Sequence, residues 1–266
     1  MIGALPVRAL NARSTSKPNE KSSVSETVFR CASEEETLES AFRLVYTSYL
    51  RAGLIEPDAL EMRVIREQLR PGSQVLVAER DGTVITTMSM VRGEEGAIPL
   101  ESIFPREVRQ QRDLGVSYAE VVSLADRRRD LRRTFAALRP LMSLMAQYAT
   151  HHSIDRLLIA VHPRHVSFYG RFLGFTPISG EAIYPSVLNH PAIAMMLDLP
   201  NLAEHHPVGY RRLFGTLIDA HALRRRPLED AVRRRFCEIA DSLARRAPQG
   251  GQEDSCDAAR AMSRCA

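Results

Sequence analysis

Apolar residues recur at helical spacing in several parts of the chain. Over about 34–51 they fall three or four positions apart, which predicts an amphipathic helix that ends at Gly53. A second helix is predicted over 57–69, between a proline at its start and a Pro-Gly stop. The same spacing over 135–149 predicts a long helix, in which Pro140 predicts a kink or a restart.

Short apolar runs between these helices predict strands, at 75–79, 84–91, 119–125, 157–161 and 192–199. The first two runs are joined by Asp81-Gly82, which is typical of a tight hairpin turn. The run at 157–161 contains no polar residue, so it predicts a strand buried on both faces. A short helix around Tyr169 follows and closes at Gly174, which can take the left-handed turn.

The order of these elements, with a further helix at about 105–113, predicts an α/β (α+β) fold with a mixed central sheet and helices on both faces. We expect this domain to span 28–200. The polar segments 1–27 and 248–266 predict disordered tails. Between the domain and the second tail, 201–247 predicts an Arg-rich helical extension of two or three helices.

Composition narrows the setting of the protein. The net charge is only +4 although the pI is near 9.0, so local basic patches matter more than the total. The four cysteines have neither zinc-ligand nor redox spacing, which favours a reduced cytoplasm. No apolar run approaches the roughly 18 residues of a membrane span, and the N-terminus has no signal-peptide core. We therefore expect a cytoplasmic protein without a transmembrane segment.

Arginine clusters in the C-terminal extension raise the question of nucleic-acid binding. Acidic residues interleave with them, and two apolar stripes are present: Leu213, Leu217, Ala220 and Leu223, then Val232, Phe236, Ile239 and Leu243. Such stripes favour helices that pack on the main domain or on a second copy as a homodimer. We therefore expect no nucleic-acid partner.

Four segments in order resemble one family of GCN5-related N-acyltransferase (GNAT) folds, the long-chain N-acyl amino acid synthases: 44–55, 98–104, 119–125 and 162–175. The resemblance implies a GNAT-like acyl-CoA N-acyltransferase fold, related to the acyl-homoserine lactone synthases. It implies transfer of a long acyl chain from acyl carrier protein to the amine of an amino acid. No cofactor would be bound permanently; the acyl-phosphopantetheine of the carrier protein, or acyl-CoA, is the co-substrate.

One departure concerns the loop after the strand at 119–125. Relatives that use acetyl-CoA have a glycine-rich loop there, whose bare amides cradle the pyrophosphate. Segment 127–135 contains no glycine, and side chains would crowd the backbone. Its arginines suit an acidic carrier protein better, unless they form only a solvated loop: Arg127, Arg128, Arg129, Arg132 and Arg133.

Glu120 is the candidate general base. It lies on a mostly apolar strand, where desolvation would raise its pKa; the alternative is a salt bridge to a neighbouring arginine. The strand amides from Ser123 through Leu124 to Ala125 can donate to the thioester carbonyl oxygen as it gains charge. The Ser123 hydroxyl would assist, or it is an ordinary strand serine.

Other candidate contacts follow from the resemblance and from local chemistry. Tyr169 occupies the position of a tyrosine that faces the thiol leaving group, although it can equally be a packing residue. Arg164 would contact the donor's phosphate. His162 and His165 lack an evident third ligand, so no metal site is expected. The apolar pocket for the acyl chain, alternatively ordinary core, is assigned to Phe42, Tyr46, Met88, Met90 and Met142.

Two other functions stay open at this point. One is an acetyl-CoA-dependent acetyltransferase, against which the missing glycine loop argues. The other is a non-catalytic module that binds acyl carrier protein or lipid. Turnover of acyl carrier protein with an amino-acid mixture separates an enzyme from a binding module.

Overall fold

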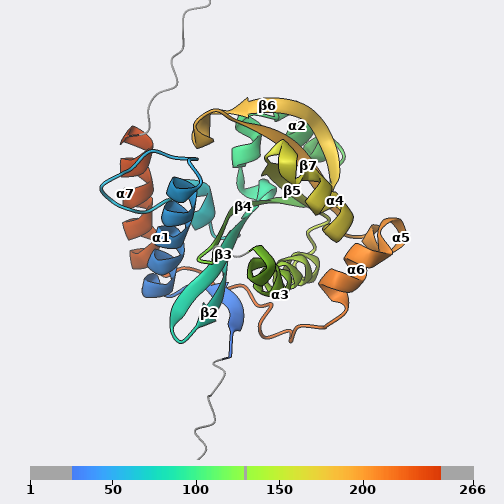
Figure 1. Cartoon of the computed structure of the whole chain (residues 1–266), viewed down its shortest axis with the longest axis horizontal. Coiled ribbons are helices and arrows are strands. Elements are labelled where there is room, and N and C mark those ends of the chain that lie inside the picture. Colours follow the sequence, from blue (N-terminus) through green and yellow to red (C-terminus); the bar gives the residue numbers. More distant parts are fainter. Residues whose placement is uncertain (1–25, 129–130, 247–266) are drawn as a thin grey trace, which may run out of the picture.

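The computed structural model describes residues 26–128 and 131–246 (Figure 1). Its centre is a seven-stranded sheet in the order β1-β2-β3-β4-β5-β7-β6. The strands are β1 (Val28–Ala32), β2 (Gln74–Arg80), β3 (Thr83–Arg92), β4 (Tyr118–Asp126), β5 (Arg156–Val161), β6 (Thr176–Tyr184) and β7 (His190–Asp198). Only β4 and β5 pair in parallel, so the predicted mixed sheet is confirmed. The tails predicted at 1–27 and 248–266 lie outside the described residues, apart from 26–27.

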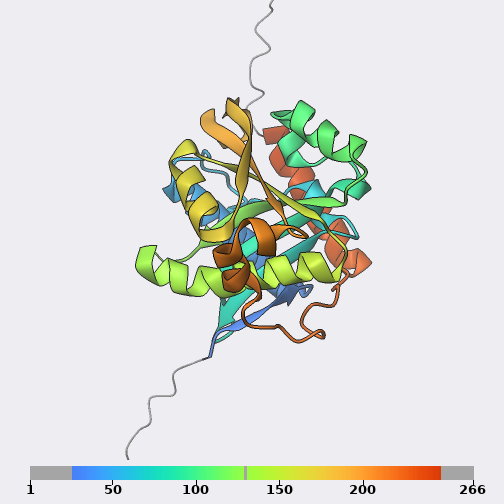
Figure 2. The ribbon, with the colours of Figure 1, turned by 90° about the vertical axis from the view of Figure 1, so that its right-hand side faces the viewer.

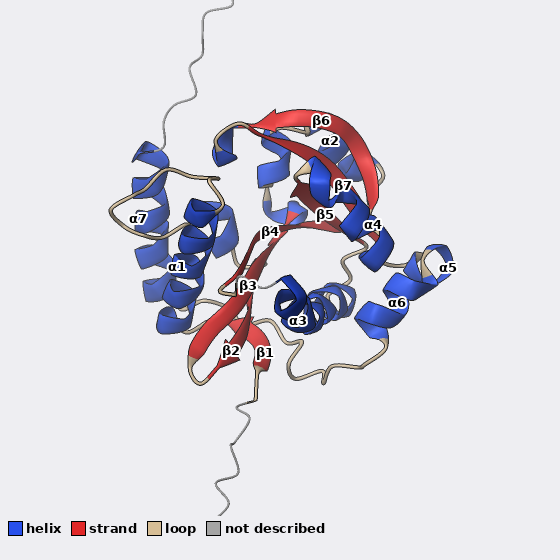
Figure 3. Ribbon diagram, in the orientation of Figure 1, coloured by secondary structure: helices blue, strands red, loops and turns tan. Residues whose placement is uncertain are grey.

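Helices cover both faces of the sheet, as predicted (Figure 3). They are α1 (Glu35–Arg51), α2 (Pro105–Asp113), α3 (Leu131–His151), α4 (Val166–Leu173), α5 (Leu202–His205), α6 (Pro207–Phe214) and α7 (Asp230–Arg246). On one face, α1 packs against the sheet and α7 packs against the outer side of α1. On the same face, α2 covers the end of the sheet near β4 and β5. On the other face α3 packs against the sheet with α6 beside it (Figure 2). The protein thus has a three-layer arrangement of helices, sheet and helices.

Charge and turn chemistry explain the limits of α1. Glu35 and Glu36 lie in its first turn and Arg51 in its last, which complements the helix dipole. Gly53 follows with a φ of 69°, a left-handed conformation that glycine adopts without steric cost. The chain then turns away from the helix axis.

The helix predicted over 57–69 is wrong. The segment is extended, with only a 3₁₀ turn at Arg66–Leu69. Asp58 accepts a hydrogen bond from the backbone of Leu60 at 2.8 Å, and Glu61 has a φ of 48°, so helical geometry is broken at the start. Met62 and Val64 are buried, whereas Arg63 between them and Ile65 after them are only partly buried. This alternation with a period of two residues is typical of an extended chain.

Two edge strands, β1 and β6, lack a readable pattern in the sequence. β6 has no fully buried side chain and contains Pro177 and Gly180, so apolar alternation is absent. The predicted restart at Pro140 is also wrong, because α3 is a single helix that contains this proline.

The C-terminal extension contains α5, α6 and α7, but one predicted stripe is wrong. α6 ends at Phe214, before the rest of that stripe, and Leu217 is 85% exposed. The second stripe is confirmed in α7, where Val232 and Phe236 are buried against α1. The ring of Phe236 meets that of Phe42 edge-on, with centroids 5.2 Å apart.

Candidate active site

The sheet opens where β4 and β5 separate. These strands pair at only three positions, the last of which joins Glu120 to Leu158. Beyond this point β5 stays paired with β7 as far as Val161, while β4 diverges from it. A cavity of about 140 Å³ lies in the opening, lined by 121–124 of β4 and 159–161 of β5.

This cavity reaches side chains from both faces of the sheet. Met142 of α3 and Leu173 of α4 line it and belong to the core cluster on the α3 face. Tyr49 of α1 lines it from the opposite face, where it packs against the α1–α7 cluster. The cavity is therefore lined from both sides of the sheet.

A β-bulge shapes the wall of the cavity. Thr87 of β3 faces Ala125, and Ser89 faces Val122, so β4 has one residue more than β3 in this stretch. The extra residue allows Ser123 a φ of 57° and interrupts the ladder on this side. Because pairing with β5 has also ended, Ser123 and Leu124 lack regular strand partners on both sides, whereas Val121 and Val122 remain paired with β3.

Glu120 is buried at the vertex of the opening. Its side chain is on the α1 face, only 1% of the residue is exposed, and Oε2 accepts a hydrogen bond from the backbone N–H of Leu100 at 2.7 Å. Burial raises the pKa of its carboxyl to about 8, against the opposing effect of the Leu100 bond. None of the ion pairs recorded for the described residues includes Glu120, so the alternative of a salt bridge to arginine is not what the structure shows.

The raised pKa of Glu120 predicts a pH-dependent stability. Between the ordinary pKa of 4.5 and about 8, the folded chain holds a proton that the unfolded chain releases. This group's contribution is therefore fully present below the lower value and lost as pH rises through the higher one. Glutamine does not ionise, so Glu120→Gln removes this pH-dependent loss. Relative to the wild type, the free energy of unfolding of the variant should therefore increase as pH rises from about 5 to about 9, at about 1.36 kcal/mol per pKa unit. Urea denaturation of both proteins measures the shift; a difference that is constant with pH would contradict it.

Tyr169 of α4 lines the cavity from the α3 face. Burial raises the pKa of its phenol to about 12, so the hydroxyl keeps its proton near neutral pH. The ring also packs edge-on against Phe175, with centroids 5.8 Å apart. The geometry thus accommodates both roles considered for Tyr169, proton donor and packing residue.

Only part of the residue set assigned to the acyl chain lies at this cavity. Met88 and Met142 line it, whereas Met90 is buried in the neighbouring core. Phe42 is also away from it, in the core under α7. The hydroxyl of Tyr46 accepts a hydrogen bond from the backbone of Asp58 at 3.1 Å, and this side chain lines a separate surface depression. Phe42, Tyr46 and Met90 therefore lie away from this cavity, and the assignment of the acyl-chain pocket stays a prediction.

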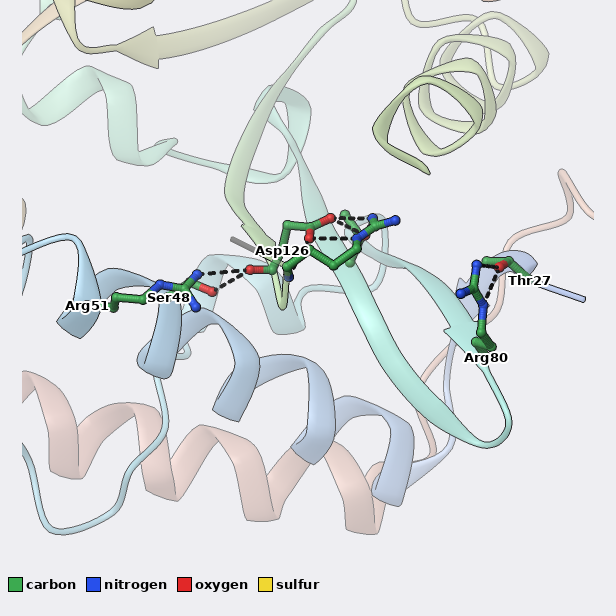
Figure 4. Close-up of polar contacts among 7 residues, drawn as sticks. Thr27, Ser48, Arg51, Arg80 and Asp126 are labelled. Atoms are coloured by element: carbon green, nitrogen blue, oxygen red, sulfur yellow. Dashed lines mark hydrogen bonds and ion pairs between the residues drawn. The ribbon is translucent and has the colours of Figure 1, made fainter. Parts of the chain in front are cut away.

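Arginines after β4 divide into different environments. Arg128 is held by Asp126, with Nη2 2.6 Å from Oδ2, and by the hydroxyl of Thr86 at 3.1 Å. The carbonyl of Asp126 in turn accepts bonds from Ser48 and Arg51 of α1 (Figure 4). This end of β4 is thus tied to α1, and the guanidinium of Arg128 is already engaged.

The structure describes only some of the other residues that were predicted to contact the acyl donor. Arg127 is exposed, in a shallow depression along α1, and Arg164 is exposed with its Nε donating to His165 at 3.1 Å. Arg129 and the side chains of Arg132 and Arg133 lie outside the described part. Ala125 is buried behind the bulge, while Leu124 lines the cavity.

The cavity residues that the sequence did not point to include Tyr49, Arg63 and Tyr184. Tyr49 belongs to the apolar stripe of α1, so the helical pattern of the sequence could have identified it. Arg63 fell inside the wrongly predicted helix, and Tyr184 ends the unrecognised strand β6. Within 26–128 and 131–246, no group of three or more His, Cys, Asp or Glu residues is arranged to hold a metal ion. No helix in those ranges is both long and apolar enough to cross a membrane.

Comparisons with known proteins agree with this geometry. The family model of the N-acyl amino acid synthase FeeM matches residues 40–198. The solved structure of FeeM, an N-acyl amino acid synthase from uncultured soil microbes, has 28% identity and a TM-score of 0.60, over 69% of this chain and 96% of that one. No curated protein sequence matches at a significant level.

Two acyl-homoserine lactone (AHL) synthases share the fold. BjaI, a CoA-dependent enzyme solved with SAM and isopentyl-CoA, has 16% identity and a TM-score of 0.56, over 80% of this chain and all of that one. The AHL synthase LasI has 13% identity and a TM-score of 0.54, over 73% and 98%.

The open sheet and these likenesses define an N-acyltransferase with a GNAT-like fold. Within that class, the chain belongs to the FeeM N-acyl amino acid synthase family, whose model matches more than half of its length. The predicted family and fold are therefore confirmed.

Proposed function

We propose that this acyltransferase moves a long acyl chain from acyl carrier protein to the amine of an amino acid. The observation that carries the proposal is the placement of Glu120, a buried carboxyl group at the vertex of a cavity lined by side chains from both faces of the sheet. An acyl thioester on the α3 side and an amine on the α1 side would meet there. Holding both reactants in line removes much of the entropic cost of the bimolecular step.

In the proposed reaction the amine nitrogen attacks the thioester carbonyl. A C–N bond forms, the C–S bond breaks, and the amine gives up one proton to the ionised carboxylate of Glu120. Backbone N–H groups at the Ser123 bulge would stabilise the oxygen as it gains charge, and the Ser123 hydroxyl would assist. The sulfur leaves as a thiolate or takes a proton from the Tyr169 hydroxyl.

The choice of carrier protein over CoA rests on the loop after β4. Segment 127–135 offers no glycine to a pyrophosphate, and its arginines suit an acidic partner. BjaI is CoA-dependent, so acyl-CoA is the competing donor. A carrier-protein donor would place the reaction in the cytoplasm. A second copy is not needed to cover α7, because α1 of the same chain covers its apolar stripe.

The donor assignment predicts salt-sensitive turnover. Palmitoyl carrier protein should be used faster than palmitoyl-CoA or acetyl-CoA, and raising the salt concentration should slow only the carrier-protein reaction appreciably. The reason is that exposed charge pairs are screened over about 8–10 Å at ordinary ionic strength. Measuring initial rates with the three donors and an amino-acid mixture at two salt levels provides the test. Faster turnover of acetyl-CoA, unaffected by salt, would favour an acetyltransferase, and binding of acyl carrier protein without turnover would favour a binding module.

A further inference from the structure

Arg63 is the basic side chain on the acceptor side of the cavity. It lines the cavity together with Tyr49 and Tyr184, on the α1 face where Glu120 also lies. It also lines a second, outer depression of about 370 Å³, formed by 54–63, the β6–β7 connection and the end of α7. The side chain therefore stands between the outer surface and the reaction site.

The guanidinium of Arg63 has donors to spare. Its Nη2 donates to the carbonyl of Ser186 at 2.9 Å, and its carbon lies 5.2 Å from the centroid of the Tyr49 ring. No ion pair recorded for the described residues includes Arg63. A guanidinium carries five N–H donors in a planar fork that matches a carboxylate. An arginine at a cavity wall without an acidic partner is thus suited to an anionic ligand.

Packing fixes the backbone on which Arg63 lies. Met62 and Val64 are buried on either side of it, and the backbone N–H of Arg63 donates to the carbonyl of Phe42 at 3.2 Å. The adjoining turn is held to α7 by the ion pair between Arg66 and Asp241. The guanidinium is therefore carried by a supported segment and not by a free loop.

The charges of Arg63 and Glu120 are arranged around the same two tyrosines. Burial raises the pKa of the Tyr49 and Tyr184 phenols; the charge of Glu120 adds to this effect and that of Arg63 opposes it. An α-amino acid has an amine and a carboxylate on neighbouring carbons. A base and a guanidinium without an acidic partner, both lining the same cavity, match these two groups.

We infer that Arg63 binds the α-carboxylate of the acceptor, which enters through the outer depression, and so makes an amino acid a better acceptor than an amine without that carboxylate. This inference rests on the proposed function and names the residue that selects the acceptor. The donor approaches from the opposite, α3 side of the sheet. Arg63 thereby acts on acceptor binding and orientation, while Glu120 takes the proton.

The test compares an amino acid that the wild type acylates with its C-terminal amide. Both have an α-amine, but only the acid has the carboxylate. For Arg63→Gln we expect kcat/KM with the acid to fall by roughly 10–100-fold, the range of a lost charge-assisted hydrogen-bond pair, mainly through a higher KM. With the amide it should change little, so that the preference for the acid disappears. Arg80→Gln, which removes an exposed arginine bonded to Thr27 at the far hairpin (Figure 4), should keep the wild-type preference.

Arg63→Lys keeps a positive charge but loses the planar fork, so it should show a reduced preference for the acid. If the melting curve shows that Arg63→Gln does not fold, the ratio of kcat/KM with the acid to kcat/KM with the amide, measured for Arg63→Lys, tests the inference instead. An equal loss with acid and amide, or an unchanged preference, would overturn the role of Arg63 and leave the proposed function standing. A wild type that acylates no amino acid with any donor would overturn both.

Discussion

Glu120→Gln should lower turnover at saturating amine by about 10²–10⁴-fold, the usual contribution of a general base. Glutamine has nearly the same shape, and its side-chain oxygen can still accept the 2.7 Å bond from the Leu100 N–H. What it loses is the ability to take a proton. Because burial raises the pKa of Glu120 to about 8, wild-type turnover should also rise with pH up to about that value as the carboxylate ionises.

A matched control for this variant is Glu101→Gln. Glu101 is paired on the surface with Arg112, at 2.6 Å, and does not line the cavity, so its loss should leave turnover close to that of the wild type. Steady-state rates over a pH series, with melting curves to verify folding, measure both effects. If folded Glu120→Gln enzyme kept near-normal turnover at saturating amine, Glu120 would not be the base, and an ionised amine would have to lose its proton to solvent.

The strands that frame the cavity could be predicted from the sequence, whereas its acceptor side could not. The runs at 119–125 and 157–161 are mostly apolar because both strands lie largely in the interior, and a glutamate in the first of them is conspicuous. The bulge at Ser123 leaves no comparable signal in the sequence. One extra residue in a strand changes only the face of the sheet on which the following side chains lie.

Arg63 illustrates the same limit at the level of local structure. Its segment carries a proline, an aspartate and apolar residues, a composition compatible with a helix start. The observed extended chain depends on Asp58 bonding to the backbone of Leu60 and on burial of Met62 and Val64 by α7 and the sheet. These long-range contacts have no local signature, so tertiary packing overrides the local pattern.

Helix α7 lies beyond the residues that the family model matches, which end at 198. Its arginines are largely neutralised within the chain: Arg235 pairs with Glu35 and Glu39 of α1, at 2.7 and 2.6 Å. This pairing and the neighbouring buried stripe, which also packs against α1, fit a packing element.

Phe236→Ala should therefore lower the free energy of unfolding by about 3–5 kcal/mol, the usual cost of removing a buried aromatic ring. The ring is fully buried and fills the space between α7 and Phe42 of α1, so its loss leaves a cavity under the helix. Arg234→Ala on the exposed side of α7 is the matched control and should stay within about 0.5 kcal/mol of the wild type. Chemical denaturation of the three proteins gives the values.

The same variant separates a packing helix from a nucleic-acid-binding one. Because α7 also holds the segment that carries Arg63, Phe236→Ala should weaken acceptor use as well as stability, whereas a DNA-binding helix could be loosened without either effect. A duplex-binding assay on the full chain near 150 mM salt should show no tight complex. An unchanged stability of Phe236→Ala, together with tight duplex binding by the intact protein, would contradict the packing role and restore the nucleic-acid interpretation of the C-terminal arginines.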